Sequence, residues 1–401
     1  MIESIQCPWS DLDPAWFLAN FWQKKPVLIR GAFKLDHFSL TPDELAGLAL
    51  EPEVDSRKIT SRSEWTLEEG PFEESDLVGF PKTHATLLVQ EVDQWIDAVF
   101  QFKTQFDFIP RWRTDDVMVS YATPEGSVGA HVDYYDVFLV QTLGTRRWKI
   151  ELSKSQDESF NQSLPIRILN HFKPDTSFIV KPGDVVYLPP HHAHHGVALS
   201  EAMTWSVGFR SPSLASIQSI LLEENLIPSL RKNLTEGDRY QDPHLKPRKF
   251  PNELLYEEDL RPILDEFSLE SSLSDEEKQR LFISFGNLVS QSFREKTVAL
   301  SRSAKVQATA KDIRHHLEKS PSWLIQANVR RFFSSLPNEV VLFQNGKSFH
   351  FDSKVCDWLI KYCDSDQFSL EFLTEILSTS TGLTLLTEIL NENLLFQEES
   401  F

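Results

Sequence analysis

The sequence predicts a mainly β core, closed as a double-sheet jelly roll and followed by a helical region and a C-terminal α+β module. Three observations indicate this. Short apolar strands with Gly and Pro turns fill residues 116–209, the pattern becomes helical after Pro212, and an Asn-Gly hairpin signal marks the last part. Many short strands of this kind favour a jelly roll over an α/β fold. The predicted domains are 1–211, 212–300 and 301–401.

The N-terminal part is expected to begin with an amphipathic helix. Asp13-Pro14 starts this helix, aromatic residues recur in it at helical spacing, and Lys25-Pro26 ends it. The elements expected after it are a strand at 27–31, a short helix at 43–50 and a second helix at 89–100.

The strands of the β core are expected after this helical part. Leu143–Thr145 and Lys181–Gly183 provide tight turns between them. The expected strands are 117–121, 137–142, 146–150, 177–180, 184–188 and 203–209.

The residues after Pro212 are expected to form helices, the clearest of which covers 275–293. Leu281, Phe285 and Leu288 fall on one face of this helix. We expect the region, to about residue 300, to form a homodimer, and a helical cap on the same core is the alternative.

The C-terminal residues are expected to form a winged-helix-like module. Strands at 339–343 and 347–351 flank Asn345-Gly346, and amphipathic helices follow. From residue 301 to 401 there are ten Lys and Arg against thirteen Asp and Glu, so direct binding to duplex DNA is not expected.

Composition narrows the function classes. The net charge of −19 disfavours a general nucleic-acid binder and is compatible with a basic partner. No run approaches about eighteen apolar residues, so no membrane span is expected. The first residues do not resemble a signal peptide, and the three cysteines form no metal-binding pair, which together favour a reducing compartment, the cytoplasm.

The most informative motif is His131-Val132-Asp133, followed about sixty residues later by a histidine-rich segment, residues 191–195. A His-x-Asp pair with a distant His is the facial triad that holds Fe(II) and leaves coordination positions open. Residues i and i+2 of a strand share a face, so His131 and Asp133 can bind one ion. Alternation lets only one of His194 and His195 face the interior, and we expect His194.

Arg146 is the candidate for binding a co-substrate. It shares a strand face with Trp148, and its planar guanidinium can grip a carboxylate with two hydrogen bonds. A 2-oxo acid would take two of the open metal positions, and 2-oxoglutarate would need such a cation for its far carboxylate. A surface cation on a hairpin is the alternative.

These motifs resemble the JmjC branch of the Fe(II)/2-oxoglutarate oxygenases and, more narrowly, the ribosomal oxygenases. Bacterial ribosomal oxygenases hydroxylate an arginine of large-subunit ribosomal protein sixteen. The matching segments are Lys24–Arg30, Val128–Asp133, Tyr135–Phe138, Gly144–Trp148, Pro182–Asp184, Tyr187–Pro190 and Ser206–Arg210.

The resemblance implies a cupin-like JmjC barrel, a helical dimerisation region and a winged-helix-like domain. It makes His131, Asp133 and His194 the catalytic iron ligands and Arg146 the residue that binds 2-oxoglutarate. With O2 as second co-substrate, the implied reaction is hydroxylation of an arginine in a basic ribosomal protein. The histidine-rich segment departs from the family pattern.

Three further residues are candidates for the mouth of the barrel. Asp116 and Ser120 share a strand face, on which Asp116 would hold a guanidinium and Ser120 would hydrogen-bond the co-substrate. Tyr135 would line the substrate channel. A turn or cap residue is the alternative for Asp116, and a core aromatic is the alternative for Tyr135.

Two other functions fit the same residues. One is a non-catalytic, metal-containing cupin that docks partners, but such a protein needs neither an open metal site nor a buried cation. The other is a JmjC lysine demethylase, whose reaction also begins by hydroxylating carbon. An acidic Asp116 face favours a basic, unmethylated side chain over the aromatic cage that suits a methylammonium group.

Overall fold

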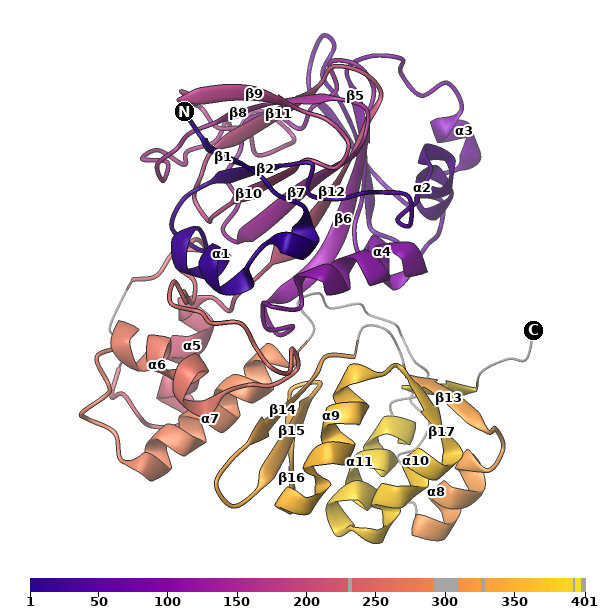
Figure 1. Cartoon of the computed structure of the whole chain (residues 1–401), viewed down its shortest axis with the longest axis vertical. Helices are drawn as coiled ribbons and strands as arrows, with labels where there is room; N and C mark the ends of the chain where they lie inside the picture. Colours follow the sequence, from indigo (N-terminus) through magenta and orange to yellow (C-terminus); the bar gives the residue numbers. More distant parts are fainter. Residues whose placement is uncertain (230–232, 292–308, 326–328, 392–393, 398–401) are drawn as a thin grey trace. The chain divides into compact units, whose positions relative to one another are not determined.

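The computed structural model describes residues 1–229, 233–291, 309–325, 329–391 and 394–397 (Figure 1). The chain divides into two compact units. The first comprises Met1–Ile109, Arg113–Ala215 and Leu234–Lys249, and the second comprises Pro110–Trp112, Ser216–Asn233 and Phe250–Phe401. The three-part division stays a prediction, because the boundary at residue 300 and the expected helix end at Phe293 lie outside the described residues.

The first unit is built on two β-sheets. One has nine strands in the order β1-β2-β10-β7-β12-β6-β5-β3-β4, and the other has three in the order β11-β8-β9. The mainly β core is thereby confirmed. The strands are β1 Glu3–Gln6, β2 Val27–Arg30, β3 Ser56–Thr60, β4 Thr66–Glu69, β5 Ala85–Val89, β6 Thr114–Ala122, β7 Asp136–Leu143, β8 Arg146–Ile150, β9 Thr176–Val180, β10 Val185–Leu188, β11 His194–Ala198 and β12 Ala202–Phe209.

Short helices accompany these sheets. They are α1 Pro14–Asn20, α2 Pro42–Leu48, α3 Glu74–Leu77 and α4 Asp97–Lys103, and α5 Leu214–Glu223 follows the last strand of the core. The helix expected at 89–100 is wrong in its first half, where β5 ends at Val89 and a 3-10 turn precedes α4. Val89, where the helix was expected to begin, is instead the last residue of β5, whose five residues are all buried. From the sequence, a short apolar run of this kind can be interpreted either as a buried strand or as part of a helix.

Alternation along the strands gives the large sheet two different faces. On one face Trp205 of β12 packs edge-on against Phe102 of α4, with ring centroids 5.2 Å apart, inside the largest apolar core. On the other face Leu139 of β7 shares a smaller apolar cluster with Trp148 and Ile150 of β8. The second cluster therefore fills part of the space between the two sheets, as expected of a jelly roll.

A buried ionic network holds the start of β7. Arg113 lies 3.2 Å from Asp136 and 2.6 Å from Asp242, and the Tyr187 hydroxyl donates to Asp136 over 2.6 Å. Arg113 and Asp136 are almost fully buried, so each charge is compensated by its partners rather than by water. The network anchors the strand that begins three residues after Asp133.

The second unit is mixed α and β. Its Asn-Gly hairpin is confirmed, since Asn345 and Gly346 take the left-handed φ angles of 49° and 78° that such a turn needs. Helix α7 begins at Asp275, as predicted, and a capping box at Ser274 precedes it. The elements are α6 Tyr256–Glu266, α7 Asp275–Val289, α8 Ala310–Leu317, β13 Ser322–Ile325, β14 Arg331–Ser335, β15 Val340–Gln344, β16 Lys347–Phe351, α9 Cys356–Asp364, β17 Gln367–Ser369, α10 Leu370–Glu375, α11 Ser380–Asn391 and β18 Leu395–Gln397.

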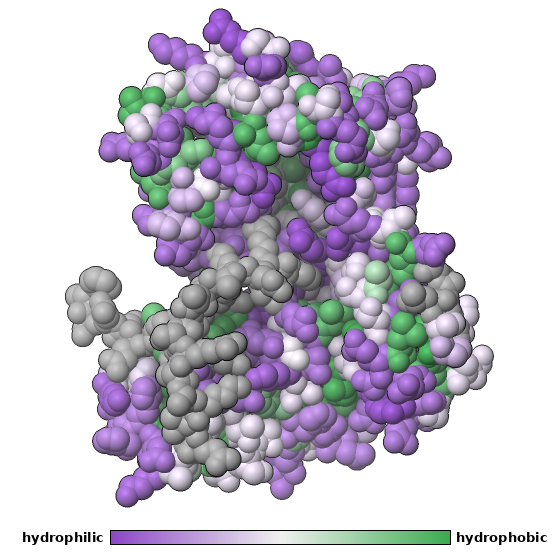
Figure 2. All heavy atoms as spheres, turned by 180° about the vertical axis from the view of Figure 1, so that it is seen from behind, coloured by the Kyte–Doolittle hydropathy of each residue, from purple (hydrophilic) through white to green (hydrophobic). Residues whose placement is uncertain are grey.

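The face of the molecule drawn in Figure 2 is mainly polar. Hydrophilic residues cover most of the face seen in Figure 2, and hydrophobic residues lie between them in small groups. Across the described residues, none of the helices has both the length and the apolar character needed to cross a membrane.

Candidate metal centre

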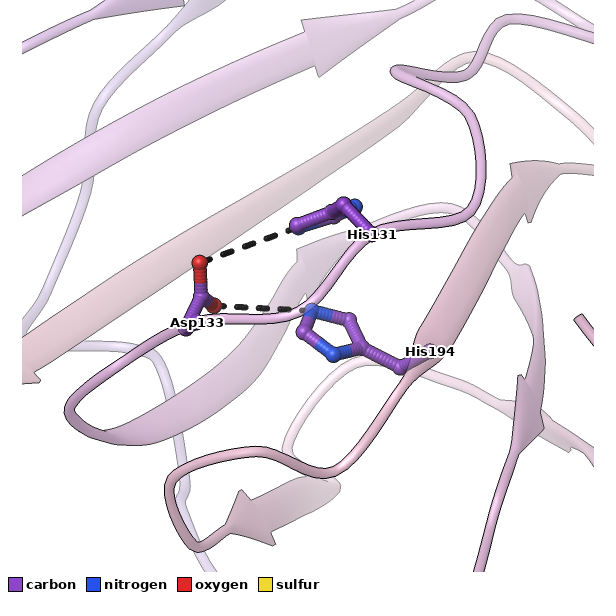
Figure 3. Close-up of side chains that lie close together, drawn as sticks. All are labelled: His131, Asp133 and His194. Atoms are coloured by element: carbon purple, nitrogen blue, oxygen red, sulfur yellow. Dashed lines mark ion pairs between the residues drawn. The ribbon is translucent and has the colours of Figure 1, made fainter. Parts of the chain in front are cut away.

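Three side chains with metal-binding atoms converge in the first unit (Figure 3). The ligand atoms of His131, Asp133 and His194 all lie within 4.8 Å of one another. The Nε2 atoms of His131 and His194 are 4.0 and 3.6 Å from the two Asp133 carboxylate oxygens. Two ligands about 2.1 Å from one ion lie up to about 4 Å apart, so small side-chain rotations would let all three bind the same ion.

The backbone ties the two motifs together. His131 and His194 exchange both main-chain hydrogen bonds, at 3.0 and 2.9 Å, and the His191 N–H donates to the Asp133 carbonyl over 2.8 Å. The regular strand expected through His131 and Asp133 is wrong, because His131 makes one isolated bridge and β7 starts only at Asp136. The bond from His191 to Asp133 is out of register with the His131–His194 bridge, so the two segments do not form a regular ladder.

Hydrogen bonds orient both imidazoles. The Nδ1 of His131 donates to the Gly129 carbonyl over 3.1 Å, and the Nδ1 of His194 donates to the His192 carbonyl over 2.9 Å. A carbonyl can only accept, so the proton sits on Nδ1 and each Nε2 keeps a lone pair for a metal. Burial, together with nearby His131, lowers the pKa of His194 to about 4, which keeps its imidazole neutral. This donor set fits a divalent transition metal.

The other histidines of the segment have different partners. His195 lies half-buried on the opposite face of β11, with Nε2 3.0 Å from the Ser127 hydroxyl. His191 bonds to Glu158 over 2.6 Å, and buried His192 donates from Nδ1 to a backbone carbonyl. The structure therefore brings His194, and not His195, to Asp133.

Arg146 is buried, and no acidic side chain of the described residues forms an ion pair with it. Only 4% of its surface is exposed, whereas neighbouring Arg147 is exposed on the other face of β8. Its Nε and Nη2 atoms are buried without a hydrogen-bond partner among the described residues. Burial lowers the pKa of Arg146 to about 10. An unpaired buried guanidinium is costly, and a bound carboxylate would remove that cost.

Ser120 lies on the same face of β6 as Asp116, as alternation predicts. Its hydroxyl is buried, stands opposite Thr204 of β12 in the strand register, and donates to the Thr204 carbonyl over 3.4 Å.

Asp116 and Tyr135 flank Gly208. A side-chain carbon placed at Gly208 would lie 3.6 Å from the Tyr135 ring and 3.8 Å from an Asp116 carboxylate oxygen. The other Asp116 oxygen accepts a hydrogen bond from the Glu91 N–H over 2.9 Å. The Asp133 carboxylate and burial raise the pKa of Tyr135 well above its usual value, so Tyr135 lies near the triad with its hydroxyl protonated.

Two residues near the site were not singled out from the sequence. Arg210 pairs with Asp115 over 3.1 Å, and its guanidinium lies 5.6 Å from the centre of the Tyr135 ring. Ser127 is buried, and its hydroxyl accepts a hydrogen bond from the Gly129 N–H, two residues before His131. Arg210 belongs to one of the resembling segments, whereas nothing in the sequence pattern marks Ser127.

A jelly-roll core with a His-x-Asp…His donor set and a buried arginine on β8 fits the JmjC class of proteins, although the JmjC class is not alone in having these features. The family model described as "JmjC domain" matches residues 101–217.

Among known proteins, the chain is 37% identical over 287 residues to the "Ribosomal protein uL16 3-hydroxylase" of Escherichia coli K12, covering 71% of this chain and 73% of the relative. It is 36% identical over 242 residues to a "Probable ribosomal oxygenase" of Haemophilus influenzae, covering 60% and 56%. The chain therefore belongs to the ribosomal oxygenases, the family that its motifs resemble.

Solved structures extend the likeness to the whole chain. The X-ray structure of E. coli ycfD matches with a TM-score of 0.68 and 30% identity, covering 96% of this chain and 98% of that one. A structure of the same ribosomal oxygenase in complex with cobalt and 2-oxoglutarate matches with a TM-score of 0.66 and 29% identity, covering 97% and 99%.

Proposed function

We propose that this chain is an Fe(II)- and 2-oxoglutarate-dependent oxygenase that hydroxylates an arginine side chain of large-subunit ribosomal protein uL16. Two observations together support this proposal: the two-His, one-Asp donor set, and buried Arg146, whose Nε and Nη2 have no hydrogen-bond partner among the described residues. The name of the E. coli relative, a uL16 3-hydroxylase, supports a ribosomal substrate. The similar solved structure that contains cobalt and 2-oxoglutarate supports the proposed metal and co-substrate.

The residues divide the work between metal and co-substrate. His131, Asp133 and His194 would hold the iron, and Arg146 would bind the distal carboxylate of 2-oxoglutarate with Ser120 beside it. The bound iron and 2-oxoglutarate supply the oxidising power to hydroxylate an unactivated carbon with O2. The protein would orient these groups and exclude water from them. Arg146, which would bind the carboxylate, is already buried from solvent.

The substrate arginine would enter beside Asp116 and Tyr135. A carboxylate suits a guanidinium, and a neutral tyrosine offers both a ring face and a hydroxyl. The net charge of −19 favours encounter with a basic protein. The carboxylate of Asp116 also supports arginine hydroxylation over demethylation of a methylated lysine, for which an aromatic cage is typical.

The activity is tested with purified protein, Fe(II), 2-oxoglutarate and uL16 from the same cells. We expect succinate to form faster when uL16 is present, and one uL16 arginine to gain about 16 Da, one oxygen atom. The control is uL16 with that arginine changed to lysine, which should stop the stimulation.

The possible outcomes separate the alternatives. A mass gain on another residue type would contradict the arginine assignment but not the oxygenase. Loss of a methyl group from a lysine would favour demethylation. Failure to turn over with any ribosomal protein would favour the non-catalytic docking protein.

We also propose that the protein is a cytoplasmic homodimer whose contacts come from the helical region, residues 212–300, with a winged-helix-like C-terminal module. Helix α7 buries Leu281 and Phe285 within its own unit, so its remaining face would have to meet the partner. Light scattering at micromolar concentration should give twice the chain mass of 46.2 kDa. A single-chain mass would contradict the dimer.

A further inference from the structure

The histidine-rich segment contains an imidazole that the metal centre does not use directly. His195 follows His194 in β11 and points to the other face of the strand. Its Nε2 lies 3.0 Å from the hydroxyl of Ser127, a residue that is only 4% exposed. The edge of its ring also faces Phe172, with centroids 6.1 Å apart. The ring is therefore held in place and aimed at one buried hydroxyl.

The Ser127 hydroxyl leads on to a metal ligand. It accepts a hydrogen bond from the Gly129 N–H over 3.0 Å, and the Gly129 carbonyl accepts from Nδ1 of His131 over 3.1 Å. The contacts thus run without interruption from His195 through Ser127 and Gly129 to His131. The last of them sets the direction of the His131 imidazole and leaves its Nε2 free for a metal.

The turn at Gly129 requires glycine. Its φ of +83° lies in the left-handed region, and a side-chain carbon there would approach Ile168 to 2.7 Å. Only glycine tolerates both conditions. The N–H and the C=O of Gly129 belong to two successive peptide groups joined at its Cα. The first is held by the hydrogen bond to Ser127 and the second by the hydrogen bond from His131, so holding the first limits where the second can point.

The path closes into a ring. His194 and His195 are adjacent in the chain, and His131 and His194 exchange two main-chain hydrogen bonds. Two of the three candidate metal ligands thus sit in one loop of covalent and hydrogen bonds, and the contact between His195 and Ser127 completes it.

We infer that His195 is a positioning residue of the metal centre. It acts on the His131 imidazole through the Ser127 hydroxyl and the backbone N–H and C=O of Gly129. The inference rests on the proposed function in one respect, that His131 binds the metal. Without the His195 ring, the buried Ser127 hydroxyl loses one of its two partners and can turn away from the Gly129 N–H that it accepts from. Outer partners of this kind typically change metal affinity by about 10- to 100-fold.

The test is a titration of the metal-free protein with Co(II), followed by the visible absorption of the bound ion. His195→Leu and Ser127→Ala should each weaken Co(II) binding by about tenfold. The double variant should bind no more weakly than the weaker single variant, because both changes break the same path. His195→Gln, whose amide can reach the Ser127 hydroxyl, should restore most of the affinity.

The control is His171→Leu, since His171 is an exposed histidine with 80% of its side chain accessible, and its removal should leave Co(II) affinity unchanged. Circular dichroism checks that each variant is folded. Ser127→Ala removes a single oxygen atom, so it decides the question if His195→Leu does not fold.

The outcomes distinguish this inference from the proposed function. If the unaltered protein binds no Co(II), the metal centre itself is wrong. If it binds Co(II), but His195→Leu and Ser127→Ala match it within about twofold, His195 has no positioning role. Additive losses in the double variant, or no recovery in His195→Gln, would also overturn the inference.

Discussion

His131→Ala is expected to abolish succinate formation and to weaken Co(II) binding by more than about 100-fold, while the protein stays folded. Loss of a direct ligand should exceed the effect of losing an outer partner, which reaches about 100-fold. The fold should survive because His131 pairs with His194 through main-chain atoms, which alanine retains. Turnover and Co(II) absorption measure the loss, and circular dichroism measures the fold.

The matched control for this change is His171→Ala, which removes an imidazole from the surface. It should leave both turnover and Co(II) binding unchanged. Turnover that survives in His131→Ala would refute the assignment of His131 to the metal.

Arg146→Met is expected to weaken the binding of 2-oxoglutarate without lowering the stability of the protein that has no ligand bound. The KM for 2-oxoglutarate should rise by about 30-fold or more, because losing one member of a buried, hydrogen-bonded charge pair costs about 2–5 kcal/mol. The variant without ligand should be at least as stable as the unaltered protein. Methionine replaces a buried guanidinium whose Nε and Nη2 have no hydrogen-bond partner among the described residues.

Two measurements check the Arg146 prediction. Kinetics at varied 2-oxoglutarate gives KM, and urea unfolding without and with 2-oxoglutarate gives stability, where only the unaltered protein should gain from the ligand. Arg147→Met is the control, since Arg147 is the exposed neighbour on the same strand. An unchanged KM in Arg146→Met, or a lower stability without ligand, would contradict the assignment.

Strand periodicity made part of the site predictable. In β8, residues alternate strictly, so the sequence alone could separate buried Arg146 from exposed Arg147. The same alternation in β11 separated His194 from His195. The period of a strand established only that neighbouring residues face opposite sides; which of the two faces inward was left open by the spacing and was chosen with the family resemblance.

Other features depended on contacts between distant residues. The chain around His131 and Asp133 is not a regular strand: it pairs with the distant histidine-rich segment through an isolated bridge at His131 and one further backbone bond at Asp133. Ser127 and His195 are 68 residues apart, and no local pattern indicates that they meet. Asp116 likewise accepts a hydrogen bond from the Glu91 backbone, which strand alternation could not reveal.

A crystal structure of the protein with Co(II) and 2-oxoglutarate, grown without O2, tests the central claim most directly. We expect one ion about 2.1 Å from Nε2 of His131, Nε2 of His194 and an Asp133 oxygen. The distal carboxylate of 2-oxoglutarate should accept hydrogen bonds from Nε and Nη2 of Arg146. An ion held instead by His191, His192 or His195, or a carboxylate bound away from Arg146, would contradict the account.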